Sequence, residues 1–401
     1  MNVLFLTIGS IGDIEDKTLY SSLLKEFRDN GHNVYAVSPY QKRDRKKTEY
    51  REEKGLHDLR VKTGNITKCS LVEKGISTLL IETQYKRAIK KFFKNVKFDL
   101  ILYSTPPITL VNVIKYIKKR DLAKSYLLLK DIFPQNAIDL GIMKNSGLKG
   151  LLYKFFRAKE KKLYAISDRI GCMSQANVDY VLKNNPEIPS EKVEICPNCV
   201  EFQDMRVSKE VRDNMRTKYD LPLDKKIFVY GGNLGRPQGI PFIIKCIEAA
   251  KENNKAFFLI VGDGTEYSKL ESYIRDKKPE NVRLMKRLPK EDYDCMVAAC
   301  DVGLIFLDHR FTIPNFPSRL LSYMQAGLPV LACTDPNTDI GRVIEDGGFG
   351  WWCESNDAAA FAAIVQNVNE LDFPIMANKE IEYFMNNYTT KQGYEIITKS
   401  L

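Results

Sequence analysis

Three segments in the second half of the sequence combine residues that suit phosphate binding. Two are rich in glycine: residues 231–239 read GGNLGRPQG, and residues 262–264 read GDG. The third, residues 316–332, reads FPSRLLSYMQAGLPVLA and places Ser318 and Arg319 in the first turn of a short helix. A helix N-terminus with a fixed cation attracts anions, and glycine lets a ligand approach the backbone closely. The three segments together therefore predict a phosphate site.

Short apolar strands alternate with helices in both halves, which predicts an α/β fold with parallel sheets. The expected strands are residues 3–9, 34–37, 98–103, 126–129 and 169–173, then 227–230, 257–261, 282–284, 302–306 and 330–333, the last closing its sheet. Functional groups in such sheets lie on the loops that follow the strands. In the first half this rule points to Gly9, Gly12, Asp13, Asp131 and Ser174.

The strand–helix pattern restarts near residue 200, and 401 residues are too many for one core. We therefore expect two Rossmann-like domains, residues 1–198 and 199–379, with a cleft between them. The boundary carries the sequence CPNC at Cys196 and Cys199. One such pair without a second pair or a nearby histidine cannot complete a zinc site, and its Pro-Asn centre suits a turn, so we interpret it as a hinge.

Several other classes of protein are disfavoured. Neither residues 9–12 (GSIG) nor residues 231–239 have the Gly-x-Gly-x-x-Gly order of dinucleotide-binding loops, and no Walker A sequence occurs. The sequence contains no run of 18 apolar residues, so no transmembrane helix is expected. The N-terminus has the pattern of a first strand rather than of a signal peptide. The nine cysteines show no disulfide framework, which fits a reducing compartment. No cluster has metal-ligand spacing, so no metal is expected.

The net charge of +10 comes entirely from the first half. Residues 1–200 hold 36 Lys and Arg against 22 Asp and Glu, and the rest of the chain holds 25 against 29. Much of the excess lies beside aromatic residues in segments 86–97, 115–120 and 149–162. These segments are either solvated helix faces or a surface for anionic lipid headgroups. Nucleic acid is not expected as a partner, because no recognised binding motif accompanies the charge.

The ordered set of motifs resembles the glycosyltransferases of the GT-B fold, most closely glycosyltransferase family 4. The matching segments are residues 231–235, 261–264, 317–319 and 326–329. In the first half, residues 131–143 (DIFPQNAIDLGIM) are similar to a branch that builds bacterial O-antigen and capsule repeats and includes transferases of N-acetyl-fucosamine-type sugars. In this fold the last helix, here residues 380–401, crosses back to the first domain.

The resemblance implies a nucleotide-sugar donor, with UDP as the expected nucleotide, bound by the second domain. The donor-binding residues it implies are Gly232, Asn233, Gly235, Gln238, Gly262, Asp263, Gly264, Asn315, Ser318 and Ser322. Arg236, Arg319 and the N–H groups of residues 235–239 would stabilise the leaving diphosphate. Asp131 is either a base, or a hydroxyl-binding group, or a turn cap. Gly9, Gly12 and Asp13 would bind the acceptor, and the reaction would retain the anomeric configuration without a metal.

The departures from the family pattern concern charge. Asn233 and Gln238 stand where the family often has an Arg and a Lys that bind pyrophosphate. Pro314 and Ser322 stand where it often has two Glu residues, which bind the sugar and the ribose. Ser322 and Asn315 could replace them only with weaker, uncharged hydrogen bonds. The donor sugar therefore stays open, with room for a deoxy or acetamido sugar.

The expected protein is a cytoplasmic glycosyltransferase of bacterial surface polysaccharide biosynthesis, peripheral at the inner face of the plasma membrane. Its acceptor would be lipid-linked, of the undecaprenyl diphosphate type, or a saccharide. Two alternatives remain open. A sugar-nucleotide epimerase of the same fold would need more acid and base groups, and the missing Glu pair would also suit a non-catalytic nucleotide-sugar-binding protein. His309, which lies shortly before the phosphate helix, could touch the donor.

Overall fold

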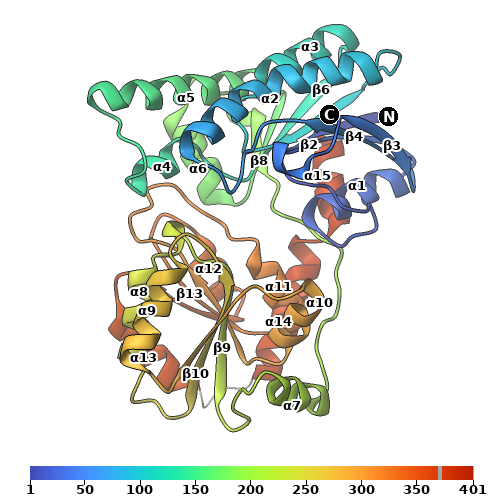
Figure 1. Cartoon of the computed structure of the whole chain (residues 1–401). Helices are drawn as coiled ribbons and strands as arrows, with labels where there is room; N and C mark the ends of the chain where they lie inside the picture. Colours follow the sequence, from blue (N-terminus) through green and yellow to red (C-terminus); the bar gives the residue numbers. More distant parts are fainter. Residues whose placement is uncertain (369–372, 401) are drawn as a thin grey trace. The chain divides into compact units, whose positions relative to one another are not determined.

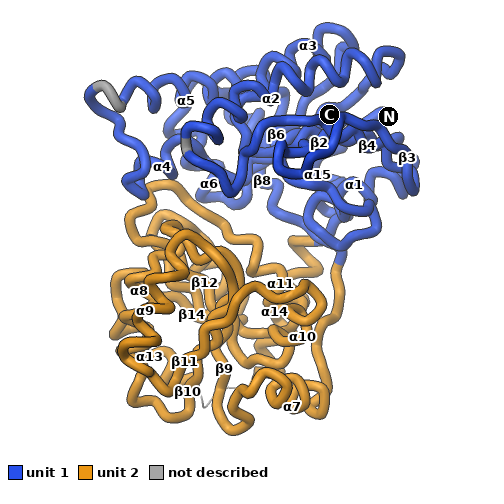
Figure 2. Tube along the Cα trace, in the orientation of Figure 1, with its two compact units in different colours: residues 1–201, 389–401 blue, residues 202–388 orange. Residues whose placement is uncertain are grey.

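The computed structural model describes residues 1–368 and 373–400, which form two compact units. Unit 1 comprises Met1–Glu201 and Thr389–Leu401, and unit 2 comprises Phe202–Tyr388 (Figure 2). The chain therefore enters unit 2 after Glu201 and returns to unit 1 at Thr389. The sequence placed these two crossings at residues 198–199 and 379–380.

Unit 1 contains an eight-stranded sheet in the described residues, in the order β3-β4-β2-β1-β5-β6-β7-β8. Its strands are β1 (Asn2–Leu6), β2 (Asn33–Tyr40), β3 (Glu49–Glu53), β4 (Leu56–Lys62), β5 (Leu100–Ser104), β6 (Lys124–Leu129), β7 (Arg169–Cys172) and β8 (Val193–Ile195). All neighbouring pairs are parallel except β3 and β4, which form an antiparallel hairpin. The central parallel strands β1, β2, β5, β6 and β7 are almost entirely buried, as the sequence predicted for a sheet covered on both faces.

Helices cover both faces of the first sheet (Figure 1). They are α1 (Leu19–Asp29), α2 (Leu71–Phe92), α3 (Val111–Asp121), α4 (Gln135–Asp139), α5 (Gly147–Ile166), α6 (Gln175–Asn184) and α15 (Thr390–Lys399), with short 3-10 turns η1 (Lys42–Asp44) and η2 (Ser190–Lys192). Helices α1 and α15 pack together on one face, and α2, α3 and α5 form the layer on the other. Leu24, Phe27 and Ile397 join the strands in one apolar core.

Unit 2 contains a six-stranded parallel sheet in the described residues, in the order β11-β10-β9-β12-β13-β14. The strands are β9 (Lys226–Asn233), β10 (Ala256–Asp263), β11 (Val282–Met285), β12 (Val302–Phe306), β13 (Val330–Thr334) and β14 (Gly350–Glu354). The helices are α7 (Lys209–Lys218), α8 (Ile240–Ala249), α9 (Tyr267–Lys277), α10 (Lys290–Ala298), α11 (Arg319–Ala326), α12 (Ile340–Asp346), α13 (Ala358–Asn367) and α14 (Phe373–Asn387), with the 3-10 turn η3 (Arg236–Gln238). Helices α8, α9 and α13 cover one face, and α7, α10, α11 and α14 lie on the other (Figure 1).

The structure corrects three expectations about the sheets. Residues 330–333 do not close the second sheet, because β14 pairs with β13 beyond them. The first sheet is not wholly parallel, since the β3–β4 hairpin extends it with strands rich in charged residues. The first glycine segment is not all loop, because β9 continues through Asn233. Apolar runs reveal buried strands, whereas these edge strands carry polar or aromatic residues that give no such signal.

The C-terminal segment is two helices rather than one. Helix α14 packs on α11 within unit 2, whereas α15 packs on α1 within unit 1. Thr389 begins α15 with a capping box: its hydroxyl accepts from the Gln392 N–H, and its own N–H donates to the Gln392 side chain. The expected return to the first domain is therefore made by α15.

Candidate functional site

The two glycine segments are joined edge to edge in the sheet of unit 2. Strand β9 pairs with β10 so that Gly232 faces Gly262, and Asn233 faces Asp263. The contact is close: a Cβ atom on Gly262 would lie 1.8 Å from the Gly232 carbonyl oxygen, and one on Gly264 would lie 2.2 Å from the Leu234 oxygen. Glycine is required here so that two backbones can meet at the carboxyl ends of their strands.

The two residues that depart from the family's cationic pair bond to each other instead. The Gln238 side-chain oxygen accepts from Asn233 Nδ2 at 2.8 Å and from the Gly235 N–H at 3.2 Å. The N–H groups of Gln238 and Gly239 donate to carbonyl oxygens within η3. In residues 235–239, all of them described, this leaves only the Arg236 N–H free, because Pro237 has none. This segment therefore offers an anion fewer backbone donors than the sequence suggested.

Arg319 supplies a cation beside the joined glycine segments. Its Nη1 donates to the Gly231 carbonyl oxygen at 2.8 Å, and its guanidinium lies 4.1 Å from the centre of the Tyr230 ring. A Cβ atom on Gly232 would lie 3.2 Å from Nη2, so glycine also makes room for this side chain. Arg319 is half-buried. A hydrogen bond and a stacking contact hold the charge in one place, which is the preorganisation that phosphate binding requires.

Helix α11 adds backbone donors to this cation. Ser318 precedes the helix, and the N–H groups of Ser318 and Arg319 donate to no group among the described residues. Ser322 lies one turn further along the helix, and Gly327 ends it with a left-handed φ of 63°. The predicted helix start is therefore present, with free donors and a fixed positive charge together.

The other cation predicted from sequence, Arg236, is more loosely held. Its side chain is 54% exposed, and its Nε lies 3.9 Å from a carboxylate oxygen of the buried Glu266. An ion pair between Asp308 and Arg310 also lies beside η3, and no sequence pattern had indicated it. Asp308 accepts two hydrogen bonds from the Arg310 side chain and one from its backbone N–H, and the Asp308 N–H donates to the Pro237 carbonyl oxygen. Burial by itself would raise the pKa of Asp308, but the pairing with Arg310 outweighs it and lowers this pKa below its usual value.

Asn315, predicted to face the sugar, lies in a segment tied to the loop after β13. Its carbonyl oxygen accepts from Thr338 Oγ1 at 2.6 Å, and its buried side-chain Nδ2 has no partner among the described residues. Asp335 in that loop is fully buried, its Oδ2 likewise has no partner in the described part of the chain, and burial raises its pKa to about 6. His309 is exposed, and its Nδ1 lies 3.7 Å from Asp308. Within the described residues, no hydrogen bond or ion pair joins His309 to Arg319 or to the glycine segments.

Asp131 follows β6 in unit 1 and presents a free carboxylate. Its backbone N–H donates to Thr105 Oγ1 at 3.2 Å. The residue is exposed, its carboxylate makes no hydrogen bond or ion pair within the described residues, and desolvation by the surrounding protein raises its pKa. It therefore caps no helix or turn. Ser174, at the end of β7, is instead buried and bonded to Asn177 at the start of α6.

The loop between β1 and α1 contains the three residues predicted to bind the acceptor. Gly9 and Gly12 are exposed, and the Gly9 N–H donates to Thr7 Oγ1. Asp13 is already paired: its carboxylate accepts from the Glu15 N–H and from Lys54. Both contacts lower the pKa of Asp13. Both glycines are thus exposed, although the Asp16 carboxylate lies against Gly12, whereas the Asp13 carboxylate is already paired with Lys54.

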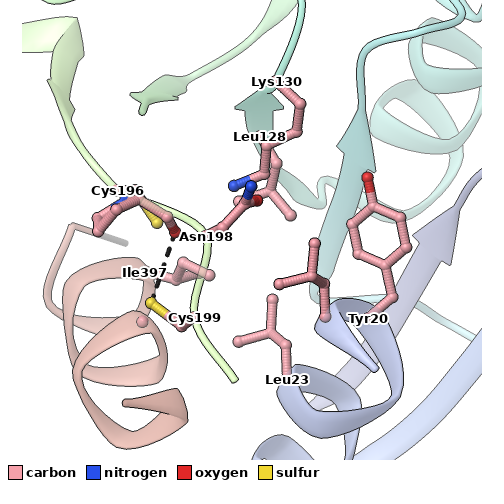
Figure 3. Close-up of a pocket in the computed structure, with 11 residues that line it drawn as sticks. Tyr20, Leu23, Leu128, Lys130, Cys196, Asn198, Cys199 and Ile397 are labelled. Carbon is pink, nitrogen blue, oxygen red and sulfur yellow. Dashed lines mark hydrogen bonds between the residues drawn. The ribbon is translucent and has the colours of Figure 1, made fainter. Parts of the chain in front are cut away.

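Unit 1 also contains a small pocket beside the Cys-x-x-Cys turn (Figure 3). It lies between α1, the end of β6 and α15, and encloses about 20 Å³, which is room for roughly one water molecule. Cys196, Cys199, Lys130 and Tyr20 line it. Burial raises the pKa of the Cys199 thiol to about 12, so this thiol stays protonated. The pocket is too small for a sugar.

Comparison with known proteins identifies this arrangement. A family model described as glycosyl transferases group 1 matches residues 211–384, which include both glycine segments and α11. The probable glycosyltransferase WbjE of Pseudomonas aeruginosa is 27% identical over 298 residues, covering 73% of this chain and 71% of that protein. The chain therefore has the GT-B fold, and its residues 211–384 are similar to the group 1 glycosyl transferases.

Further relatives agree with this assignment. The putative colanic acid biosynthesis glycosyl transferase WcaI of Escherichia coli is 23% identical over 64% of each chain. Among solved structures, HepE of Anabaena in complex with UDP superposes with a TM-score of 0.69 at 14% identity, covering 100% of this chain and 99% of that one. At this identity the match shows the fold alone. WbjE covers both units, whereas the family model covers only the unit that holds Arg319.

Proposed function

We propose that this protein is a glycosyltransferase that moves a sugar from a UDP-sugar to a lipid-linked or saccharide acceptor in bacterial surface polysaccharide biosynthesis, and that it belongs to family 4. The observation that carries the proposal is Arg319, fixed beside two joined glycine segments at the start of α11. Two relatives support the proposal: WcaI is named for colanic acid biosynthesis, and the HepE structure contains UDP.

The chemistry needs positive charge where the sugar–phosphate bond breaks. As the anomeric C–O bond breaks, negative charge builds on the leaving diphosphate, and preorganised donors there lower the barrier. Arg319 and the N–H groups of Ser318 and Arg319 are suited to this task, with the exposed cation of Arg236 as a second contributor. Asn233 and Gln238 would offer only neutral contacts, since they bond to each other.

We assign Asp131 to the acceptor. Its free, exposed carboxylate can accept a hydrogen bond from an acceptor hydroxyl and take its proton as the new glycosidic bond forms. The acceptor would lie by Gly9 and Gly12. In a retaining reaction the leaving phosphate oxygen can take that proton instead, and Asp131 then orients the hydroxyl. We propose retention and no metal requirement, and the product's anomeric configuration and the activity in EDTA test these two points.

A lipid-linked acceptor requires the protein to reach a membrane. None of the described helices is long and apolar enough to cross one. Of the three basic segments, the first two use their aromatic residues internally: Lys86 and Lys90 lie over the Tyr116 ring, and Phe93 is buried. Phe92 and Tyr116 are half-buried, so these two segments offer cations but no fully exposed aromatic side chain.

The third basic segment and the start of α2 do expose apolar side chains. On α5 these are Leu151, Leu152 and Phe155, and on α2 they are Val72, Ile76, Leu79 and Leu80. The side chain of Lys149, which begins the third segment, lies outside the described residues. Lys154, Lys159, Lys161 and Lys162 follow on α5. An apolar stripe with lysines on one helix suits an anionic lipid surface, so we propose a peripheral position at the inner face of the plasma membrane.

Donor turnover tests the transferase proposal. Purified protein is mixed with UDP-sugars and a lipid diphosphate acceptor, and UDP and glycolipid are measured. The proposal expects both products in equal amounts. Interconversion of a free UDP-sugar without acceptor would instead identify an epimerase. Thermal stabilisation by UDP-sugar without any turnover would identify a binding protein, since a ligand at 100 times its Kd stabilises by about 2.7 kcal/mol.

Vesicle flotation tests the membrane proposal separately. Replacing Leu151, Leu152 and Phe155 with serine should reduce flotation with anionic vesicles at physiological salt. Leu223→Ser is the matched control, because Leu223 is 55% exposed but lies in unit 2. If the triple variant floats as well as the wild type, α5 is not the lipid-binding surface.

A further inference from the structure

We propose that Arg60 is a positioning residue for the acceptor, because it fixes the shape of the loop between β1 and α1 from the neighbouring β3–β4 hairpin. That this loop binds the acceptor rests on the proposed function. The contacts that hold the loop do not depend on it. Neither Arg60 nor the hairpin was expected from the sequence pattern.

Arg60 touches the loop at two adjacent residues. It lies on β4, and its Nη1 donates to Ser10 Oγ at 3.2 Å while its Nη2 donates to the Ile11 carbonyl oxygen. Its side chain is only 12% exposed, and the guanidinium lies 5.5 Å from the centre of the Tyr40 ring. Arg60 therefore has little freedom to turn toward solvent.

Asp58 aims the guanidinium at the loop. Its Oδ2 accepts from Arg60 Nε at 2.7 Å, so that both terminal nitrogens of Arg60 remain for the loop. Asp58 is buried, and Arg51 on β3 approaches the same oxygen at 3.2 Å. The three donor atoms of Arg60 therefore serve three different acceptors. A lysine has the charge but only one nitrogen, and it cannot reproduce this fork.

The turn of the hairpin holds the other end of the loop. Lys54 and Gly55 form a two-residue turn with φ values of 50° and 78°, as tight hairpins require. Lys54 pairs with Asp13, and Arg28 donates to the Lys54 carbonyl oxygen at 2.9 Å. The turn is itself fixed on α1 by Arg28. The hairpin thus tethers the loop at its middle through Arg60 and near its end through Lys54.

The tether sets where the loop's backbone donors point. Carbonyl and N–H groups of a trans peptide face opposite ways, so binding the Ile11 oxygen to Arg60 turns the Gly12 N–H away from the hairpin. Gly12 is exposed, and its N–H donates to no group within the described residues. This N–H is therefore available for a hydroxyl or phosphate oxygen of the acceptor. Without Arg60 the Ile11–Gly12 peptide can rotate, and the donor loses its direction.

Steady-state kinetics test this with Arg60→Lys. The matched control is Arg51→Lys, since Arg51 contacts Asp58 and Glu49 on the same hairpin but does not touch the loop. We expect the acceptor KM to rise about tenfold in Arg60→Lys, with the donor KM and kcat within about twofold of the wild type. The control should leave all three within about twofold. An unchanged acceptor KM, or equal rises for donor and acceptor, would overturn the proposal.

Amide hydrogen exchange gives a readout that needs no substrate. The N–H groups of Gly9 and Asp13 each donate to a side chain of the loop region, at 3.0 and 2.9 Å. In Arg60→Lys both should exchange several times faster, while the β1 amides and the control variant do not change. Unchanged exchange would refute the tether even if the enzyme is active. If the wild type transfers no sugar but the exchange result holds, the proposed function fails and the tether stands.

Discussion

Replacing Arg319 with glutamine should separate its task in the reaction from its task in packing. Glutamine keeps a donor near the Gly231 carbonyl oxygen, which now accepts from Nη1 at 2.8 Å, but it removes the charge. Arg319→Lys keeps the charge and loses the planar group that stacks on Tyr230 at 4.1 Å. Comparing the two variants therefore distinguishes the effect of the charge of Arg319 from the effect of its planar shape.

The expected magnitudes differ enough to be told apart. Loss of one preorganised donor at a leaving group costs ~2.7–4 kcal/mol, which is 10²–10³ in kcat. The packing loss is smaller, about 1–2 kcal/mol, because one hydrogen bond and one stacked cation on a half-buried side chain are removed. We expect Arg319→Gln to lose about a hundredfold or more in kcat, and Arg319→Lys about tenfold.

Lys226→Gln is the matched control for the stacking contact. Lys226 begins β9, at the opposite end of the strand from Gly231, and its Nζ lies 4.3 Å from the centre of the Phe373 ring. The control should shift the melting temperature to a similar degree without lowering kcat. The assay is UDP release at saturating donor and acceptor, beside thermal unfolding. A loss of less than about threefold in Arg319→Gln, or an equal loss in the control, would refute the assignment of Arg319 to the leaving diphosphate.

Three further outcomes are expected for unit 2. Glu380 is fully buried on α14, and neither carboxylate oxygen has a partner among the residues that the structure describes. Burial raises its pKa well above 4.5, so the stability that this group contributes is complete below pH 4.5 and is lost as pH rises toward the folded-state pKa. Glu380→Gln should therefore melt higher than the wild type at about pH 8 and equally at about pH 4.5; the same difference at both would contradict this. Arg216 is fully buried and pairs with Asp301 at 2.7 Å, so Arg216→Met should lower the free energy of unfolding, measured by urea titration, by ~3 kcal/mol. Arg212 is more exposed and lies 3.2 Å from the same carboxylate, so Arg212→Ala should lower it by less than ~1 kcal/mol. Gly262→Ala should cost more than about 2 kcal/mol by the same method, because the new methyl would lie 1.8 Å from a carbonyl oxygen of β9, and an unchanged midpoint would show that the strands can separate.

The sequence determined the parallel sheets and the donor segments of this protein. Buried parallel strands must be apolar along their whole length, so runs such as those of β1, β9 and β13 were visible directly. The start and end of α11 could also be predicted from the sequence, because they are set by proline, serine and glycine residues at or next to the helix ends. The order of these motifs sufficed for the GT-B resemblance.

Charge pairing could be settled only by the tertiary structure. Asn233 and Gln238 satisfy each other, Asp13 is paired with Lys54, and the Asp131 carboxylate is free. No spacing rule separates these cases, because each depends on a side chain that arrives from a different element. Glu266 was passed over for the same reason, since only the fold places it near Arg236.

The edge hairpin is the clearest example of what the sequence left hidden. Residues 49–62 alternate charged and apolar side chains over a short stretch that resembles an exposed loop. In the fold they become β3 and β4, and Arg60 and Lys54 are brought against a loop more than 40 positions away in the chain. Local patterns report which backbone a segment prefers. Contacts between distant segments are decided by packing, and it is these contacts that hold the glycine loop of unit 1 and fix Arg319 beside the glycine segments of unit 2.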